Sequence, residues 1–258
     1  MRICLAQTRP VKGDIQRNIE KHKAFVELAI AHRANLVIFP ELSITGYEPT
    51  LAHELATTKD DVRFDEFQKI SDAKHISIGI GVPTRNDSGI FISMVIFQPH
   101  KTRETYSKKY IHADEDPFFV SGQGSVSSIG RKGEIALAIC YEVLVPRHSE
   151  EAFRSGARIY LASVAKTAHG VANAANKLSG IARNFSMTVL MCNCVGPCDN
   201  FQAAGKSAVW NDKGELIAQL DEASEGMLLF DSDTREAIEI LSVITSAAPG
   251  YGSALYWF

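Results

Sequence analysis

The sequence has no excess of positive charge and no long hydrophobic run. Its 27 Lys and Arg residues are outnumbered by 30 Asp and Glu residues, which gives a formal net charge of -3. This balance predicts no basic face for nucleic acid. No apolar stretch approaches the roughly 20 residues that cross a bilayer, and the one near the N-terminus is too short for a signal peptide. We therefore expect a cytoplasmic protein with neither a nucleic-acid nor a membrane partner.

Cysteine is also scarce. The chain has five cysteines, and the odd number argues against a disulfide framework. Three of them form a C-x-C-x3-C pattern, which suggests zinc, but no fourth ligand has an obvious spacing and His169 would be an arbitrary choice. We expect no metal there, and packed thiols or a redox-sensitive loop are the alternatives. The five are Cys4, Cys140, Cys192, Cys194 and Cys198.

No internal repeat, low-complexity tract or linker rich in Pro and Ser interrupts the chain. Hydrophobic residues make up 45% of the sequence and charged residues 22%, a balance typical of globular proteins. Single domains of about 250 residues are common among α/β sandwiches and barrels. We therefore predict one domain over residues 1–258, with a core over about 1–231 and a C-terminal extension over 232–258.

Apolar runs and helical spacings alternate along the chain, which predicts an α/β fold. Hairpin and turn signals also occur, and purely parallel winding has no hairpins, so the pattern favours a mixed sheet or two packed sheets with helices outside. Strands are predicted at Ile3–Gln7, Leu36–Phe39, Ile76–Val82, Ile90–Phe97, Ile135–Ile139, Ile159–Ala162, Val189–Cys194 and Met227–Phe230, the last of the core. Helices are predicted at Ile15–Ala29, Val62–Lys74, Glu150–Ser155 and Asn173–Phe185, and turns at Arg85–Gly89, Arg131–Gly133 and Asn211–Gly214.

A carboxylate directly follows one buried strand. Glu41 stands in the segment FPELSITGY, Phe39–Tyr47, just after the apolar run LVIF. In α/β proteins, ligands gather beyond the carboxyl ends of strands. A glutamate there is a candidate general base whose pKa is raised by apolar walls. A helix-capping or solvated acid is the alternative interpretation.

Two lysines and one cysteine also follow strands. Lys108 and Lys109 come after Tyr106 in ETYSKKYIHADE, and a lysine in a cleft stabilises a developing oxyanion. Cys140 ends the apolar run IALAI, where a thiol beside backbone N–H groups suits a nucleophile. The alternatives are a solvated basic loop for the lysines and a buried small hydrophobe for the cysteine.

The order of these motifs resembles the nitrilase superfamily of carbon–nitrogen hydrolases. Members carry a Glu in a Phe-Pro-Glu segment that leads to Gly-Tyr, a Lys in a Tyr-x-Lys segment and a Cys in a Cys-Tyr-(Asp/Glu) segment. A further Glu lies between the Lys and a Phe-x-x-Gly stretch. The matching residues are Glu41 before Gly46-Tyr47, Lys108 after Tyr106-Ser107, Cys140 before Tyr141-Glu142, and Glu115 before Phe119–Gly122. The resemblance covers the chain to about Asp231. It implies an αββα four-layer sandwich with two mixed β-sheets, and a homodimer paired through a helical face.

The resemblance also implies roles for these residues. Glu41 would take the proton of the Cys140 thiol, and the thiolate would attack an amide carbon to give an acyl-thioester. Lys108 and a backbone N–H, that of Tyr141, would hold the oxyanion, while Glu115 would orient Lys108 or Glu41. No metal or organic cofactor is required. Tyr47, Glu142 and Lys166 are further candidates for binding the substrate.

The predicted function is thiol-dependent hydrolysis of a non-peptide C–N bond in a small linear amide. Relatives often place an aromatic residue near the substrate where this chain has Val164-Ala165-Lys166. Lys166 suggests a substrate that carries a carboxylate, and a solvated lysine is the alternative. N-carbamoyl hydrolysis or acyl transfer with the same groups, or a non-catalytic binding role for the fold, are the competing interpretations.

Overall fold

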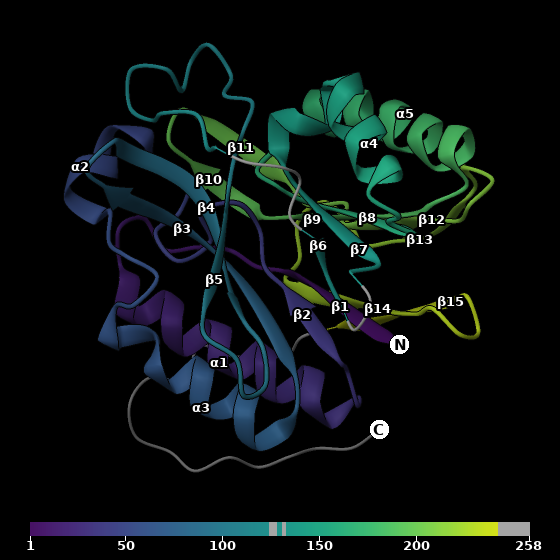
Figure 1. The fold of residues 1–258 in the computed structure, drawn as a ribbon, viewed down its shortest axis with the longest axis horizontal. Coiled ribbons are helices and arrows are strands. Elements are labelled where there is room, and N and C mark those ends of the chain that lie inside the picture. The colour runs from purple at the N-terminus through teal and green to yellow at the C-terminus, as the bar shows by residue number, and fades with distance from the viewer. Residues whose placement is uncertain (124–127, 131–132, 242–258) are drawn as a thin grey trace.

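The computed structural model describes residues 1–123, 128–130 and 133–241 of the chain. Two mixed β-sheets lie face to face, and helices cover the outer face of each (Figure 1). This is the αββα sandwich that the sequence predicts. Arg131 and Lys132 of a predicted turn, and residues 242–258 of the predicted C-terminal extension, lie outside the described residues.

The first sheet has seven strands in the order β15-β14-β1-β2-β3-β4-β5. β1 pairs with β2, and β2 with β3, in parallel, whereas the other neighbours are antiparallel. Helices α1 and α3 cover its outer face (Figure 1). The elements are β1 (Arg2–Gln7), α1 (Ile15–Ala31), β2 (Leu36–Ile38), α3 (Asp65–Lys74), β3 (Ser77–Asn86), β4 (Gly89–Phe97), β5 (Glu104–Ser107), β14 (Gly226–Asp231) and β15 (Glu236–Leu241).

The second sheet has six strands in the order β13-β12-β9-β8-β7-β6. Its centre, β7-β8-β9, is parallel, and its edges are antiparallel. Helices α4 and α5 cover its outer face (Figure 1). The elements are β6 (Ser128–Ile129), β7 (Ile135–Ile139), α4 (Pro146–Arg154), β8 (Ile159–Val164), α5 (Ala168–Phe185), β9 (Thr188–Asn193), β12 (Ala208–Trp210) and β13 (Leu216–Gln219).

The core lies between the two sheets, where side chains such as Leu5 and Ile38 of the first pack in one cluster with Leu137 and Leu161 of the second. Both sheets are covered on both faces, which explains why their central strands are continuous apolar runs without polar alternation. The remaining elements are short: α2 (Ala52–Leu55), 3-10 helices at Pro49–Leu51, Val62–Phe64 and Cys140–Leu144, and the hairpin of β10 (Val195–Cys198) and β11 (Phe201–Ala204).

Several element bounds differ from the prediction. α4 begins at Pro146 rather than Glu150, because proline is accommodated in the first turn of a helix. α5 begins at Ala168 rather than Asn173, and the Thr167 hydroxyl caps it by accepting from the Gly170 N–H at 3.1 Å. Met227–Phe230 lies in β14, the last buried strand, and the mostly exposed strand β15 follows and pairs with it. No helix in the described part of the chain is long and apolar enough to cross a membrane.

Candidate active site

Glu41 is positioned by the turn that follows β2. Two side chains of α1 hold this turn: the His22 ring is hydrogen-bonded to the Ser43 hydroxyl at 2.8 Å, and the Asn18 amide donates to the Ile44 carbonyl at 2.9 Å. Burial lowers the pKa of His22 to about 3, so its ring is neutral at neutral pH. The Glu41 side chain is buried and points away from solvent. Neutral side chains therefore hold the turn that carries Glu41.

Lys108 directly follows β5 and is fully buried. Its backbone N–H donates to the Ile92 carbonyl of β4 at 2.8 Å, which extends the strand pairing up to this residue. Its ammonium donates to Glu41 Oε1 at 2.9 Å and to the two oxygens of Glu115 at 2.7 and 2.8 Å. Two carboxylates therefore share one ammonium, which satisfies a buried charge that would otherwise be strongly unfavourable. Lys109, the neighbouring candidate, instead pairs with Glu151 of α4 at 3.0 Å.

Glu115 and Glu41 differ in how their oxygens are used. Both oxygens of Glu115 are occupied, because Tyr47 donates its hydroxyl to Oε1 at 2.8 Å and His112 its backbone N–H to Oε2 at 2.9 Å. By contrast, Glu41 Oε2 is buried and has no hydrogen-bond partner among the described residues. Glu115 is thus held in place, while Glu41 keeps one oxygen free to accept a proton. A buried acceptor without a partner calls for an explanation, and a catalytic role supplies one.

Cys140 lies at the junction of β7 and the 3-10 helix Cys140–Leu144. Its φ is +42°, a left-handed conformation that costs a non-glycine residue about 1–3 kcal/mol and recurs at active sites. Its thiol contacts the Ala165 carbonyl at 3.8 Å and lies near enough to Glu41 for the two groups to shift each other's pKa. The structure therefore brings Glu41, Lys108, Glu115 and Cys140 together, from strands of both sheets.

Burial and charge set the protonation of this cluster. Burial raises the pKa of Glu41; the Lys108 ammonium opposes this rise and Glu115 adds to it. Burial and then Glu41 raise the pKa of the Cys140 thiol, and Lys166 and Lys108 oppose that rise. Burial alone would lower the pKa of Lys108, but Glu41, Cys140 and Glu115 raise it above its usual value. At neutral pH the thiol is therefore protonated and the ammonium stays charged.

Tyr141 and Lys166 flank Cys140. The N–H of Tyr141 belongs to the first turn of the 3-10 helix, where N–H groups lack intrahelical acceptors. Lys166 is half-buried, and its backbone is fixed by Asn193, whose side chain accepts from the Lys166 N–H at 2.9 Å and donates to its carbonyl at 3.2 Å. No carboxylate of the described residues pairs with its ammonium. The wall beside the thiol thus carries an unpaired positive charge, held by an asparagine that the prediction did not include.

The Glu142 carboxylate is occupied by hydrogen bonds from the protein, and substrate binding by this residue stays a prediction. Its buried carboxylate accepts from the backbone N–H groups of Ile139 and Lys109 at 2.7 and 2.6 Å and from the Tyr106 hydroxyl at 2.7 Å. The sequence places Glu142 two residues after the candidate nucleophile but does not reveal that its side chain folds back beneath the turn.

The three clustered cysteines do not converge on one point. Cys192 faces the core between the sheets, where its thiol contacts the Ala6 and Ile38 carbonyls at 3.4 and 3.3 Å. Cys194 and Cys198 are buried elsewhere, with their sulfur atoms 3.7 Å apart. Within the residues that the structure describes, no group of three or more His, Cys, Asp or Glu side chains is arranged to hold a metal ion.

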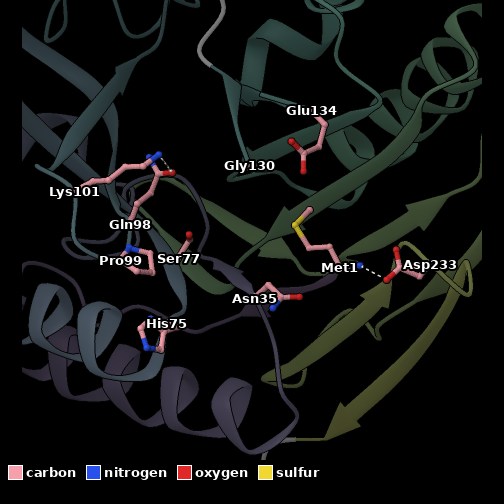
Figure 2. Close-up of a pocket in the computed structure, with 10 residues that line it drawn as sticks. All are labelled: Met1, Asn35, His75, Ser77, Gln98, Pro99, Lys101, Gly130, Glu134 and Asp233. Atoms are coloured by element: carbon pink, nitrogen blue, oxygen red, sulfur yellow. Dashed lines mark hydrogen bonds and ion pairs between the residues drawn. The ribbon is translucent and has the colours of Figure 1, made fainter. Parts of the chain in front are cut away.

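A cavity of about 700 Å³ lies away from this cluster (Figure 2). Its walls come from the edge where β1, β2, β3 and β7 begin, whereas Glu41 and Cys140 lie where β2 and β7 end. Figure 2 shows the Met1 amino group paired with Asp233, at 2.9 Å, on one side of this cavity. The lining residues are Met1, Asn35, His75, Ser77, Gln98, Pro99, Lys101, Gly130, Glu134 and Asp233. The cavity therefore contains none of the candidate catalytic groups.

A comparison with protein families matches residues 2–240 to the carbon–nitrogen hydrolases. The chain belongs to this family. It is 24% identical over 245 residues to a probable nitrilase from Schizosaccharomyces pombe, which covers 91% of this chain and 89% of the relative. It is also 24% identical to a 2-oxoglutaramate amidase from Bacillus subtilis, over 88% of this chain and 89% of that enzyme. A glutamine-dependent NAD(+) synthetase from Thermotoga maritima is 24% identical, but this chain spans only 43% of its length.

Solved structures of carbon–nitrogen hydrolases share the fold. The NitN amidase from Nesterenkonia sp. AN1 superimposes with a TM-score of 0.82 at 23% identity, over 90% of this chain and 92% of that one. A mutant of this amidase in complex with butyramide gives a TM-score of 0.81 at 22% identity, over 89% of both chains. At this level of identity the likeness establishes the sandwich architecture.

Proposed function

We propose that this carbon–nitrogen hydrolase cleaves a small linear amide through an acyl-thioester on Cys140. One observation carries the proposal: Glu41, Lys108 and Cys140 meet in a buried cluster in which Glu41 Oε2 has no hydrogen-bond partner among the described residues. A carboxylate with a free oxygen beside a thiol is a general base, and a fixed ammonium beside both is an oxyanion donor.

Acylation follows from this arrangement. Glu41 takes the thiol proton as the sulfur attacks the amide carbon, so the S–C bond forms and the carbonyl oxygen gains a negative charge. The Lys108 ammonium and the Tyr141 N–H hold that oxygen. The protonated Glu41 then gives its proton to the nitrogen, the C–N bond breaks, and ammonia leaves. The raised pKa of Glu41 suits a group that must both accept and return a proton near neutral pH.

Deacylation reuses the same base. Glu41 takes a proton from water as the water oxygen bonds to the acyl carbon, and Lys108 again holds the oxyanion. The C–S bond breaks, the acid leaves, and the sulfur recovers its proton from Glu41. Throughout, Glu115 keeps the Lys108 ammonium in place through its two hydrogen bonds of 2.7 and 2.8 Å. Lys108 retains its proton because its pKa lies above the usual lysine value.

Lys166 supports a substrate that also bears a carboxylate. Its ammonium affects the pKa of the Cys140 thiol, so it lies near the reacting sulfur, and it has no carboxylate partner among the described residues. A half-buried cation without a partner favours an anionic ligand group, and an ammonium–carboxylate contact in such a site is a charge-assisted hydrogen bond. The name of one relative, 2-oxoglutaramate amidase, agrees with an amide substrate.

The decisive experiment combines product release with trapping of the intermediate. Ammonia release is measured for carboxylate-bearing amides, neutral amides, N-carbamoyl amino acids and nitriles, and the acyl-enzyme is captured by rapid acid quench and located by mass spectrometry. We expect ammonia from the amides and an acyl adduct on Cys140. Cys140→Ala should stay folded and release none. Full activity of Cys140→Ala, or no ammonia from any amide, would contradict the proposal. Faster product formation with hydroxylamine than with water would instead assign acyl transfer.

A further inference from the structure

Glu142 connects the two chain segments that carry Lys108 and Cys140. Its Oε1 accepts from the Lys109 N–H at 2.6 Å, directly after the candidate lysine. Its Oε2 accepts from the Ile139 N–H at 2.7 Å, directly before the candidate nucleophile. One segment extends β5 of the first sheet and the other ends β7 of the second. A single carboxylate therefore ties together, across the interface between the sheets, the two segments whose side chains must meet.

A chain of neutral groups fixes the orientation of this carboxylate. Tyr106 donates its hydroxyl to Glu142 Oε2 at 2.7 Å, and the Tyr106 oxygen lies 2.8 Å from His148 Nε2. His148 Nδ1 lies 2.8 Å from the Tyr160 hydroxyl. Burial lowers the pKa of His148 to about 4, so the ring is neutral. With its proton on Nε2, it donates to Tyr106 and accepts from Tyr160, and each contact is satisfied.

The energetics argue against a role in packing alone. Glu142 is fully buried. The neutral His148 ring lies 3.5 Å from its carboxylate, and no cationic side chain of the described residues lies within ion-pair distance of that carboxylate. Burial raises its pKa, and the hydrogen bonds from Tyr106, Ile139 and Lys109 oppose that rise. A buried carboxylate without a cation is unfavourable unless its oxygens accept hydrogen bonds. Two of the donors here are the peptide N–H groups next to Lys108 and Cys140. These hydrogen bonds therefore fix the distance between the two residues.

We propose that Glu142 is a positioning residue for the reaction, one that holds the Cys140 thiol in register with the Lys108 ammonium. It does not touch the substrate. The inference rests on the proposed function, because register matters only if Lys108 stabilises charge formed by attack of Cys140. Misplacement of reacting groups by about 1 Å lowers a rate by as much as 10²-fold.

The test replaces the carboxylate by its isosteric amide. In Glu142→Gln one oxygen becomes an NH₂ group that faces a peptide N–H, so one of the two backbone connections is lost. We expect kcat to fall by about 10²-fold while KM changes far less. The matched control is Glu225→Gln, because Glu225 also accepts from a backbone N–H, that of Arg9 at 2.7 Å, and from Lys21 at 2.9 Å, and neither partner belongs to the cluster. It should keep the kcat of the wild type.

A second measurement separates this inference from the proposed function. Iodoacetamide alkylates Cys140 without any amide turnover, and its rate at neutral pH depends on Glu41 accepting the thiol proton. This rate should fall in Glu142→Gln and stay unchanged in Glu225→Gln. If the wild type is alkylated at Cys140 but hydrolyses no amide, the proposed function fails and the register with Lys108 fails with it, while the alkylation rates still show whether Glu142 places the thiol beside Glu41.

Four outcomes would overturn the positioning role. A folded Glu142→Gln protein with wild-type kcat and alkylation rate shows that the register does not depend on the carboxylate. Equal losses in Glu142→Gln and Glu225→Gln show a general effect on stability. If Glu142→Gln does not fold, Glu142→Asp keeps the charge but is too short to hold both segments. A folded Asp variant with wild-type kcat, or a failure of both variants to fold, assigns the side chain to stability alone.

Discussion

Lys166 is a half-buried cation in the wall beside Cys140. The sequence predicts a cation after the β8 strand, but the lack of a carboxylate partner and the clamp from Asn193 become visible only in the structure. Glu41 and Cys140 are predictable because each follows an apolar strand, and Lys108 because it stands in a short motif of the family that the sequence resembles. Glu142 is not, because its role depends on the side-chain direction in a 3-10 turn, which spacing alone does not determine.

Substitution of Lys166 by methionine should change which amides are hydrolysed. A hydrogen bond to a charged group contributes about 1.5–3 kcal/mol, so kcat/KM for a carboxylate-bearing amide should fall roughly ten- to hundredfold. The value for a neutral amide of the same length should change little. Lys177→Met, at an exposed position on α5, is the control. Equal kcat/KM values for acidic and neutral amides in the wild type, or an unchanged ratio in Lys166→Met, would refute the carboxylate assignment.

At the scale of secondary structure, strand ends place the site. The long apolar strands were predicted within one to four residues, because burial on both faces gives an unbroken hydrophobic run. The hairpin of β10 and β11 and the edge strand β15 were missed. β10 contains Gly196 and Pro197, which are unfavourable in strands, and the EAIEIL segment of β15 has its two glutamates three positions apart and so lacks the alternation of a half-buried strand. Short edge elements depend on a neighbouring strand that the sequence does not reveal.

Gly81 of β3 shows how one strand supports the turn that carries Glu41. A Cβ at this position would lie 2.3 Å from the Pro40 carbonyl oxygen and 2.4 Å from the Leu42 nitrogen. Gly81→Ala should therefore push the turn away and lower both stability and kcat. Overpacking in a rigid environment costs about 1–3 kcal/mol, and the displaced carboxylate no longer faces the thiol.

The measurement for Gly81→Ala is denaturant unfolding together with kcat for the best amide. Gly180→Ala is the matched control, because no atom lies within 4 Å of a Cβ added at this helical glycine. Since alanine is favoured over glycine in a helix by about 0.5–1 kcal/mol, the control should be as stable as the wild type or more so. A Gly81→Ala protein with wild-type stability and kcat would show that the turn tolerates the displacement.

At the scale of the whole molecule, the two sheets share one core and each supplies part of the candidate site. The sandwich architecture was predictable because hairpins interrupt an otherwise alternating pattern and because the three motifs occur in a known order. The packing of one sheet against the other was not predictable from spacing, because it depends on contacts between residues more than 100 positions apart. The Ser163 hydroxyl, for example, donates to the Phe39 carbonyl at 2.8 Å. The single domain over 1–258 and the cytoplasmic location stay predictions.

The homodimer implied by the family resemblance also stays a prediction, and α4 and α5 offer the face to test. Phe153 of α4 is 45% exposed, and its ring centre lies 5.2 Å from that of Phe185 at the end of α5. An aromatic pair with one exposed ring on a helical surface is typical of a contact site, and a two-fold axis would bring the same pair from each copy together. We therefore expect the wild-type chain to be a dimer in light scattering, and Phe153→Asp to shift it to the monomer because a desolvated carboxylate opposes burial.

Val62→Asp is the control, since Val62 is 78% exposed on the side of the other sheet and should leave the dimer intact. A monomeric wild type, or a Phe153→Asp protein that dimerises as strongly as the wild type, would exclude this face as the interface.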